Sequence, residues 1–532
     1  MTNPVMTLVP VMAFLALLLA VGFIANRSLR KSEDFERDYF IANRSLGGVV
    51  LAMTLVATYG SVSSFVSGPG VAWNLGFGWV AFAAPQIITG FLLLGVVGKK
   101  LAVLARRTDS LTIIDILRER YGSNTLSIIF SAVLLIFFTA MVVGQFMGGA
   151  QIFAAITGLD YKLGLVLFAA VTVIYTSSGF RAVVWTDAVC AVLMLTGMVT
   201  LGYTILEDGG GLSSIMQTLS AADLTANGVS RHLLPDAGGL LPWSLLFSSW
   251  LLVGFCTVGL PQSLVRCLSY KSTRDLSRAM VVATVICGAL MIGMTLLGVL
   301  ARGVILEKPA SGTDAVIPLL IVNHMHPLLA GITIIGPLAA TMSTVSSLLI
   351  AASSTVVRDL YEKSFGKNPA DISHDASKKI SVTITLLLGA VSILLAMYPQ
   401  SIVVWVNLFA FGGLESAFLW PVVLGLFWPR MNACGAMAGV FGGLGLYTLA
   451  MATGFHFYHF HNIVIGTAAG LLFSVIGSYF GTPTPRSVKA VFFPHKIGHG
   501  GYRPSKTQKV FQAFCVFCFP RERLRTTAPR AR

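Results

Sequence analysis

Two hydrophobic segments of this chain contain glycines, hydroxyl side chains and a proline at positions that interrupt a helix. The first, residues 54–70, contains Gly60, Ser61, Ser63, Ser64 and Gly68-Pro69-Gly70, which together could supply both a break and oxygen ligands. Lipid offers no hydrogen bonds, so irregular backbone at membrane depth must line a cavity or bind something. The second segment, residues 254–262, lies in the other half of the chain and contains Gly254, Gly259 and Pro261. Paired interruptions of this kind indicate the central site of a secondary transporter.

A third segment supplies hydroxyl groups that could complete such a site. It contains Ser343, Thr344, Ser346 and Ser347 within five residues. Backbone carbonyls at a helix break can coordinate a dehydrated sodium ion, and neutral hydroxyls on a facing helix add further oxygen ligands. Alternatively, each hydroxyl bonds back to its own helix or serves close helix packing. The density of the cluster favours a cation site.

Three ionisable residues lie in or beside hydrophobic segments, where a charge is costly and is a functional candidate by default. Asp187 could pair with Arg181 near the inner surface, or reach the hydroxyl cluster and raise its cation affinity. For Glu415 the sequence leaves three roles open: pairing with another charged residue in the structure, protonation, or contact with a substrate. We expect Arg266 to anchor its segment at the inner membrane surface.

The composition requires a membrane. The 532 residues are 55% hydrophobic and only 11% charged, and mean hydropathy is +0.79. Runs of 18 or more apolar residues are long enough to span a bilayer. The sequence predicts an all-α integral membrane protein with about thirteen transmembrane helices, near 5–25, 46–71, 75–98, 124–153, 162–180, 183–206, 241–266, 276–301, 327–357, 379–397, 402–428, 433–453 and 462–480.

The net charge of +15 follows the same membrane pattern. With thirteen spans and the N-terminus outside, all but four of the 37 Lys and Arg residues fall on the inner side; the four are Lys162, Arg231, Arg302 and Lys308. This is the positive-inside bias. It predicts a cytoplasmic C-terminus and argues against nucleic-acid binding.

The spans divide into two blocks of five. The first block occupies residues 46–206, a polar outer loop occupies 207–240, and the second block occupies 241–430. Five is odd, so the second block must insert upside down relative to the first, and an interrupted span opens each block. The remaining parts are a first helix with its loop (1–45), two accessory helices (431–481) and a basic tail (482–532).

Collinear segments from about residue 36 to residue 483 closely resemble the sodium:solute symporters, in particular their bacterial pantothenate-transporting members. The matching segments include Tyr39-Phe40, Arg44-Ser-Leu-Gly-Gly48, Leu51 to Tyr59, Ser63-Ser-Phe65, Gly68-Pro-Gly70, Gly98-Lys-Lys100, Leu104 to Arg107, Gly259-Leu-Pro261, Val265 to Lys271, Pro337 to Ala340, Met342-Ser-Thr344, Asp359-Leu-Tyr361, Asn407 to Glu415 and Leu419-Trp-Pro421.

This resemblance implies a LeuT-like core of two inverted five-helix repeats, with sodium as the coupling ion in the bacterial inner membrane. Carried over by position, the sodium site takes oxygens of Ala57, Gly60, Ala340, Ser343 and Thr344. A second sodium site would use Ser343, Ser346, Ser347 and Asp187. The implied substrate positions are Ser61, Ser64, Phe65, Gln86, Thr257, Gln262 and Asn407. Gln86 and Asn407 can donate and accept hydrogen bonds, which suits the amide and hydroxyls of pantothenate.

Other functions remain open from the sequence. A sodium symporter for proline, a monocarboxylate or another small metabolite is the nearest alternative, and a passive channel or a solute sensor is a more distant one. We do not expect an enzyme, because no nucleophile–base pair or metal motif lies at a consistent depth. Cys515 and Cys518 could form a metal or redox pair, although no second pair accompanies them. The sequence indicates no obligatory protein partner.

Overall fold

Apolar segments that cross a bilayer fold as helices, because a helix satisfies its own backbone hydrogen bonds. The computed structural model describes residues 4–29, 35–364, 374–398 and 403–494, and every named element in these ranges is helical. Ten of these helices are long and apolar enough to cross a membrane, and two bent helix pairs bring the number to twelve. The expected all-α membrane class is confirmed.

The helices correspond one to one with the expected spans once Tyr161–Thr176 is included, an apolar helix of 16 residues. The two bent pairs are the interrupted spans. Gly48–Tyr59 meets Ser63–Leu75 at 68°, and Trp243–Gly259 meets Pro261–Leu268 at 48°. The breaks therefore fall at Gly60 and Leu260, inside the segments that the sequence singles out. Gly68-Pro69-Gly70 does not interrupt the span, because these residues begin the helix Gly68–Leu75, and a proline is tolerated in the first turn of a helix.

The elements of the first repeat are, in chain order, α3 (Gly48–Tyr59), η2 (Ser63–Ser67), α4 (Gly68–Leu75), α5 (Phe77–Ala83), η3 (Ala84–Ile88), η4 (Phe91–Gly98), α6 (Lys99–Arg107), α7 (Ile113–Tyr121), α8 (Asn124–Thr157), α9 (Tyr161–Thr176) and α10 (Phe180–Asp208). The η elements are short 3-10 or π-helical segments. Elements α1 (Pro4–Leu29), α2 (Phe35–Ile41) and η1 (Ala42–Arg44) precede this repeat.

The loop at residues 207–240, expected on the outer side, contains α11 (Leu212–Ala221), η5 (Arg231–Leu233) and η6 (Ala237–Gly239). The second repeat contains α12 (Trp243–Trp250), η7 (Leu251–Phe255), η8 (Cys256–Gly259), α13 (Pro261–Leu264), η9 (Val265–Leu268), α14 (Thr273–Ala301), η10 (Thr313–Ala315), α15 (Val316–His324), α16 (Pro327–Ser354), η11 (Thr355–Ser364), α17 (His374–Ala396) and α18 (Val403–Phe427). It is followed by α19 (Ala433–Thr453), η13 (Phe457–His459), α20 (Ile463–Phe480) and α21 (Arg486–Phe492).

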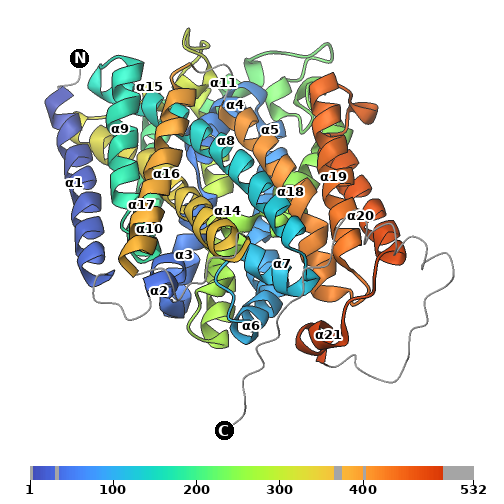
Figure 1. Ribbon diagram of the computed structural model, residues 1–532. Coiled ribbons are helices and arrows are strands. Elements are labelled where there is room, and N and C mark those ends of the chain that lie inside the picture. The colour runs from blue at the N-terminus through green and yellow to red at the C-terminus, as the bar shows by residue number, and fades with distance from the viewer. Residues whose placement is uncertain (1–3, 30–34, 365–373, 399–402, 495–532) are drawn as a thin grey trace.

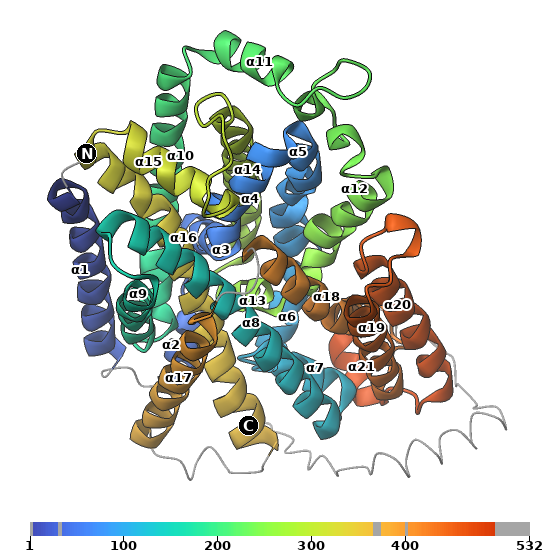
Figure 2. The same ribbon diagram turned by 90° about the horizontal axis from the view of Figure 1, so that it is seen from above.

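The long helices run roughly parallel between two ends of the molecule (Figure 1). One end carries the start of α1 together with α11 and α15, and the other carries α2, α6, α7 and α21. Seen from above, α1 and α9 lie at one edge and the α19–α20 pair at the opposite edge, while α3, α13 and α16 lie inside (Figure 2). The functional site is therefore to be sought around these inner helices.

Helix α16 is the most enclosed of the long helices. Buried residues make up 83% of its most apolar stretch, against 28% in α1. It packs against α10, α8, α1 and α3, which is the half of the second span that precedes the break. Its polar residues, including the hydroxyl cluster, are thus shielded from lipid on all sides.

Several helices were not expected from the sequence. Element α6 extends the third span to Arg107, beyond its expected end at residue 98. Element α7 lies at the same end of the molecule, and α11 and α15 lie in the loops at the other end. These three helices are too short to span a bilayer, so a search for long apolar runs does not find them. The cysteine pair Cys515 and Cys518 lies outside the described residues.

Candidate functional site

The break in the second span frees backbone groups at the centre of the protein. Gly60 ends α3 with an extended conformation (φ −67°, ψ 118°), and its N–H still donates to the Val56 carbonyl at 2.7 Å. Beyond the break, the N–H of Val62 donates to the side-chain oxygen of Gln145 on α8 at 3.0 Å. A buried polar side chain thus satisfies one freed donor, and the carbonyls before the break are left facing α16.

The two hydroxyls of α16 meet those carbonyls. The Ser343 hydroxyl donates to the carbonyl oxygens of Ala57 at 2.8 Å and Ala340 at 3.1 Å. The Thr344 hydroxyl lies 3.0 Å from the Gly60 carbonyl oxygen and 2.9 Å from that of Ala340. Both side chains are buried. All five groups assigned to sodium by resemblance therefore lie together, and we call this set the oxygen cage.

The oxygen cage fits a small monovalent cation chemically. All five oxygens are neutral, three are carbonyls that can only accept, and the two hydroxyls can turn their hydrogens away and present lone pairs. Carbonyls at an unwound helix are the groups that coordinate sodium in transporters built on broken helices. Within the described residues, no group of three or more His, Cys, Asp or Glu side chains could hold a metal ion.

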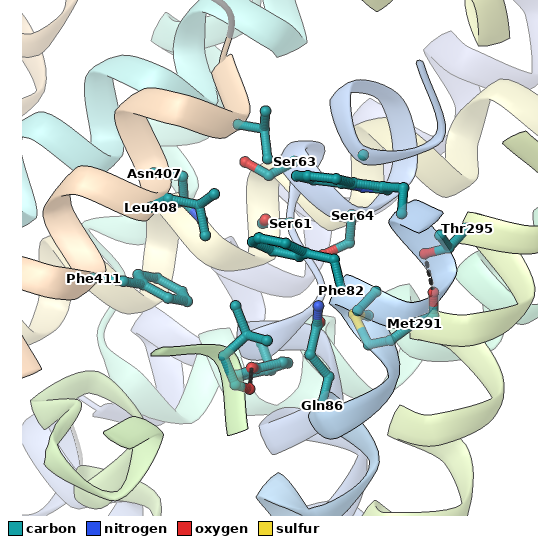
Figure 3. Close-up of a pocket in the computed structure, with 16 residues that line it drawn as sticks. Ser61, Ser63, Ser64, Phe82, Gln86, Met291, Thr295, Asn407, Leu408 and Phe411 are labelled. Carbon is teal, nitrogen blue, oxygen red and sulfur yellow. Dashed lines mark hydrogen bonds between the residues drawn. The ribbon is translucent and has the colours of Figure 1, made fainter. Parts of the chain in front are cut away.

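A cavity of about 50 Å³, room for a few water molecules, lies beside the break. Four of the seven predicted substrate positions line it: Ser61, Ser64, Gln86 and Asn407. Figure 3 shows Gln86 directing its amide into this space from one side, and Asn407 lying on α18 across from it. No Asp, Glu, Lys or Arg is among the lining residues.

The other three predicted substrate positions do not line this cavity. Phe65 is fully buried, and the Thr257 hydroxyl donates to the Gly254 carbonyl of its own segment at 2.6 Å. The Gln262 side chain is buried with its amide nitrogen 3.9 Å from the sulfur of Met141. In this conformation these three residues pack between helices.

Aromatic and aliphatic side chains form much of the wall and were not predicted. They include Tyr59, Trp79, Phe82, Val253, Met291, Val404, Leu408 and Phe411. The rings of Trp79 and Phe82 stack with centroids 4.2 Å apart, and both residues line the cavity. A sequence signal existed, because residues three or four apart share a helix face. Trp79 and Phe82 precede Gln86 at that spacing, and Phe411 follows Asn407 by four residues.

Asp187 lies deep in the protein, away from Arg181. Arg181 instead pairs with Asp38 at 3.5 Å. Asp187 is fully buried, accepts a hydrogen bond from Thr54 Oγ1 at 2.6 Å, and lies 3.6 Å from a guanidinium nitrogen of Arg266. Of the predicted second-sodium groups, Ser347 also contacts Arg266, while the Ser346 hydroxyl donates to the Ser343 carbonyl at 2.9 Å.

The expectation that Arg266 anchors the inner surface is wrong. Its side chain is 1% exposed, in the interior next to α10 and α16. The chain bends after Leu260, so the short α13–η9 segment turns its side chains inward instead of continuing to the surface. A buried arginine is costly unless a carboxylate pairs with it. Asp187 supplies that carboxylate and so offsets the cost of burying Arg266.

Glu415 stays outside this arrangement. It is fully buried in α18, it does not line the cavity, and neither of its carboxyl oxygens has a hydrogen-bond partner in the described part of the chain. The three roles considered for it from the sequence remain open.

Comparisons with known proteins identify the family of this chain. A sequence profile of the Sodium:solute symporter family matches residues 39–443. The "Sodium/pantothenate symporter" of Escherichia coli (strain K12) is 39% identical over 485 residues, which are 90% of this chain and 98% of that protein. The protein of the same name from Haemophilus influenzae is 41% identical over 85% of this chain and 92% of its own.

More distant relatives carry a different name. The "Osmoregulated proline transporter OpuE" of Bacillus subtilis is 29% identical over 83% of this chain and 87% of its own. Among solved structures, a Na+-coupled sialic acid symporter in a substrate-bound outward-open state matches with a TM-score of 0.76 at 20% identity, covering 90% of this chain and 99% of its own. This likeness establishes the fold.

Proposed function

Because this chain belongs to the sodium:solute symporter family, we propose that it imports pantothenate together with sodium across the bacterial cytoplasmic membrane. The observation that carries the coupling is the oxygen cage, in which carbonyls of the broken span face two hydroxyls of α16. The cage joins two helices that must move relative to each other during transport, so a sodium ion held there stabilises one of their arrangements. The choice of pantothenate is supported by the two relatives near 40% identity, since the proline transporters are more distant.

The residues that line the cavity suit an uncharged, hydrogen-bonding body with a carboxylate at one end, and the cavity must widen beyond its volume in this conformation to admit pantothenate. Gln86 and Asn407 offer amide donors and acceptors for the amide and hydroxyls of pantothenate, and Trp79 and Phe82 cover its carbon chain. With no cationic side chain in the wall, the carboxylate would face the coupling sodium. Ser61, which lines the cavity, directly follows Gly60, whose carbonyl belongs to the oxygen cage. A carboxylate in the cavity would therefore lie close to a sodium ion in the cage.

Transport would proceed by alternating access. The repeats at 46–206 and 241–430 each open on a broken span, and the bundle containing these spans would rock against the scaffold that includes α8 and α16. We place the N-terminus outside and the C-terminus in the cytoplasm, because the end of the molecule with α6, α7 and α21 carries the expected inner-side Lys and Arg residues.

One transport experiment tests the function. Purified protein in proteoliposomes should accumulate radiolabelled pantothenate above the external concentration when an inward sodium gradient is imposed. Replacing sodium by potassium should abolish this accumulation. A panel of unlabelled competitors, including proline and monocarboxylates, should inhibit less than unlabelled pantothenate. Downhill equilibration alone would indicate a passive channel, and stronger inhibition by proline would reassign the substrate.

Truncating Gln86 and Asn407 singly to alanine should weaken substrate binding. Each change removes a polar contact worth about 1–3 kcal/mol when buried, so KM for pantothenate should rise about 5- to 150-fold. The sodium concentration for half-maximal uptake, measured at saturating pantothenate, should change much less. Gln217→Ala is the matched control, since Gln217 is exposed on α11 of the outer loop. Equal losses in all three variants would show that the effect is not local to the cavity.

A further inference from the structure

Arg266 places a guanidinium group inside the protein near the oxygen cage. Its Nη1 donates to the Gln262 carbonyl oxygen at 2.9 Å, and its Nη2 donates to the Ser347 hydroxyl. The same Nη2 lies 3.6 Å from Asp187 Oδ2, and both charged side chains are buried. The guanidinium thus has a carboxylate and two oxygen acceptors around it.

These contacts involve groups that the family resemblance assigns to a second sodium ion. Asp187 and Ser347 both belong to that set. Thr54 Oγ1 donates to the same Asp187 oxygen at 2.6 Å, and the Thr58 hydroxyl lies 3.1 Å from that of Ser347. Asp187 Oδ2 and the Ser347 hydroxyl therefore face the guanidinium and α3, while Asp187 Oδ1 has no hydrogen-bond partner in the described residues. The guanidinium occupies the space between Asp187 and Ser347 that a second ion would need.

We propose that Arg266 is the resident cation at this second position, so that the protein couples one sodium ion, and not two, to each substrate molecule. The proposal rests on the proposed function. A guanidinium is charged at all physiological pH values, and its planar donors suit several oxygen acceptors. The guanidinium is part of the chain and stays in place throughout the transport cycle. It therefore neutralises Asp187 without the entry of a second sodium ion.

The consequence is a limit on accumulation. One sodium ion with one pantothenate anion moves no net charge, so a tenfold sodium gradient supports about tenfold accumulation, whatever the membrane potential. A second sodium ion would add its own gradient and one net charge, and at 100 mV would permit accumulation of roughly a few thousandfold.

Two measurements on the purified protein test this. Equilibrium binding of ²²Na+ counts the sodium ions per chain. Uptake of radiolabelled pantothenate into proteoliposomes, with and without an inside-negative potassium diffusion potential, measures the net charge. For the unaltered chain we expect one sodium ion and no response to the potential.

Arg266→Gln is expected to free Asp187 for a second sodium ion, giving two ions per chain and uptake that the potential accelerates. Adding Asp187→Asn should return the count to one. Arg266→Lys keeps the cation and should stay at one ion. Two bound sodium ions or voltage-driven uptake in the unaltered chain would overturn the proposal, even if Arg266→Gln does not fold. So would one ion in a folded Arg266→Gln. If pantothenate uptake fails altogether, the proposed function fails, while the ²²Na+ counts still decide the role of Arg266.

Discussion

Replacing Ser343 and Thr344 together by alanine is expected to abolish sodium-dependent uptake. The change removes two of the five oxygens in the cage and leaves the carbonyls of Ala57 and Gly60 without partners on α16. Each lost ligand contact is worth about 1–3 kcal/mol, so the sodium concentration for half-maximal uptake should rise by more than about 30-fold. The measurement is the initial rate of pantothenate uptake in proteoliposomes over a series of sodium concentrations.

The same helix provides a matched control. Ser354 and Thr355 are also an adjacent buried pair, but both hydroxyls donate to the Ala351 carbonyl of their own helix, at 2.8 and 3.0 Å. Changing both to alanine removes two hydroxyls without touching the broken span. Sodium dependence should be unchanged there. If the Ser343/Thr344 double variant keeps its sodium dependence, the oxygen cage is not the coupling site.

Hydropathy and local backbone chemistry explain how much of this fold could be predicted. A bilayer requires long apolar helices, so the expected spans correspond to helices of the structure. Gly60 and Gly259-Leu-Pro261 fall at the two bends because backbone preferences act locally. The oxygen cage was assembled from the resemblance to a family, and the structure brings its five residues together.

Side-chain depth and direction could not be predicted in the same way. Arg266 lies near the end of an apolar run, which indicates a surface anchor. Its burial depends on a bend that turns α13 and η9 inward and on Asp187, about 80 positions earlier in the chain. Thr257 was expected in the substrate pocket, but its hydroxyl donates to the Gly254 carbonyl of its own segment instead. Both features depend on tertiary packing.

Gly298 should tolerate no side chain, because α14 crosses the start of α4, Gly68-Pro69-Gly70, at this residue. A Cβ at Gly298 would lie 2.3 Å from the Pro69 carbonyl oxygen and 2.5 Å from the Pro69 Cα. These are backbone atoms, so α4 or α14 must shift as a whole. Overpacking of this kind costs about 1–3 kcal/mol and would displace α4, which belongs to the half of the broken span that follows Gly60.

For Gly298→Ala we therefore expect an unfolding temperature lower by several degrees in detergent, and pantothenate uptake reduced more strongly than the amount of folded protein. Gly445→Ala is the matched control, since Gly445 is a helical glycine on α19 with no atom within 4 Å of an added Cβ. It should keep both stability and transport. Normal stability with normal uptake in Gly298→Ala would mean that α4 and α14 can separate at this crossing without cost to the site, and that their close contact does not position the broken span.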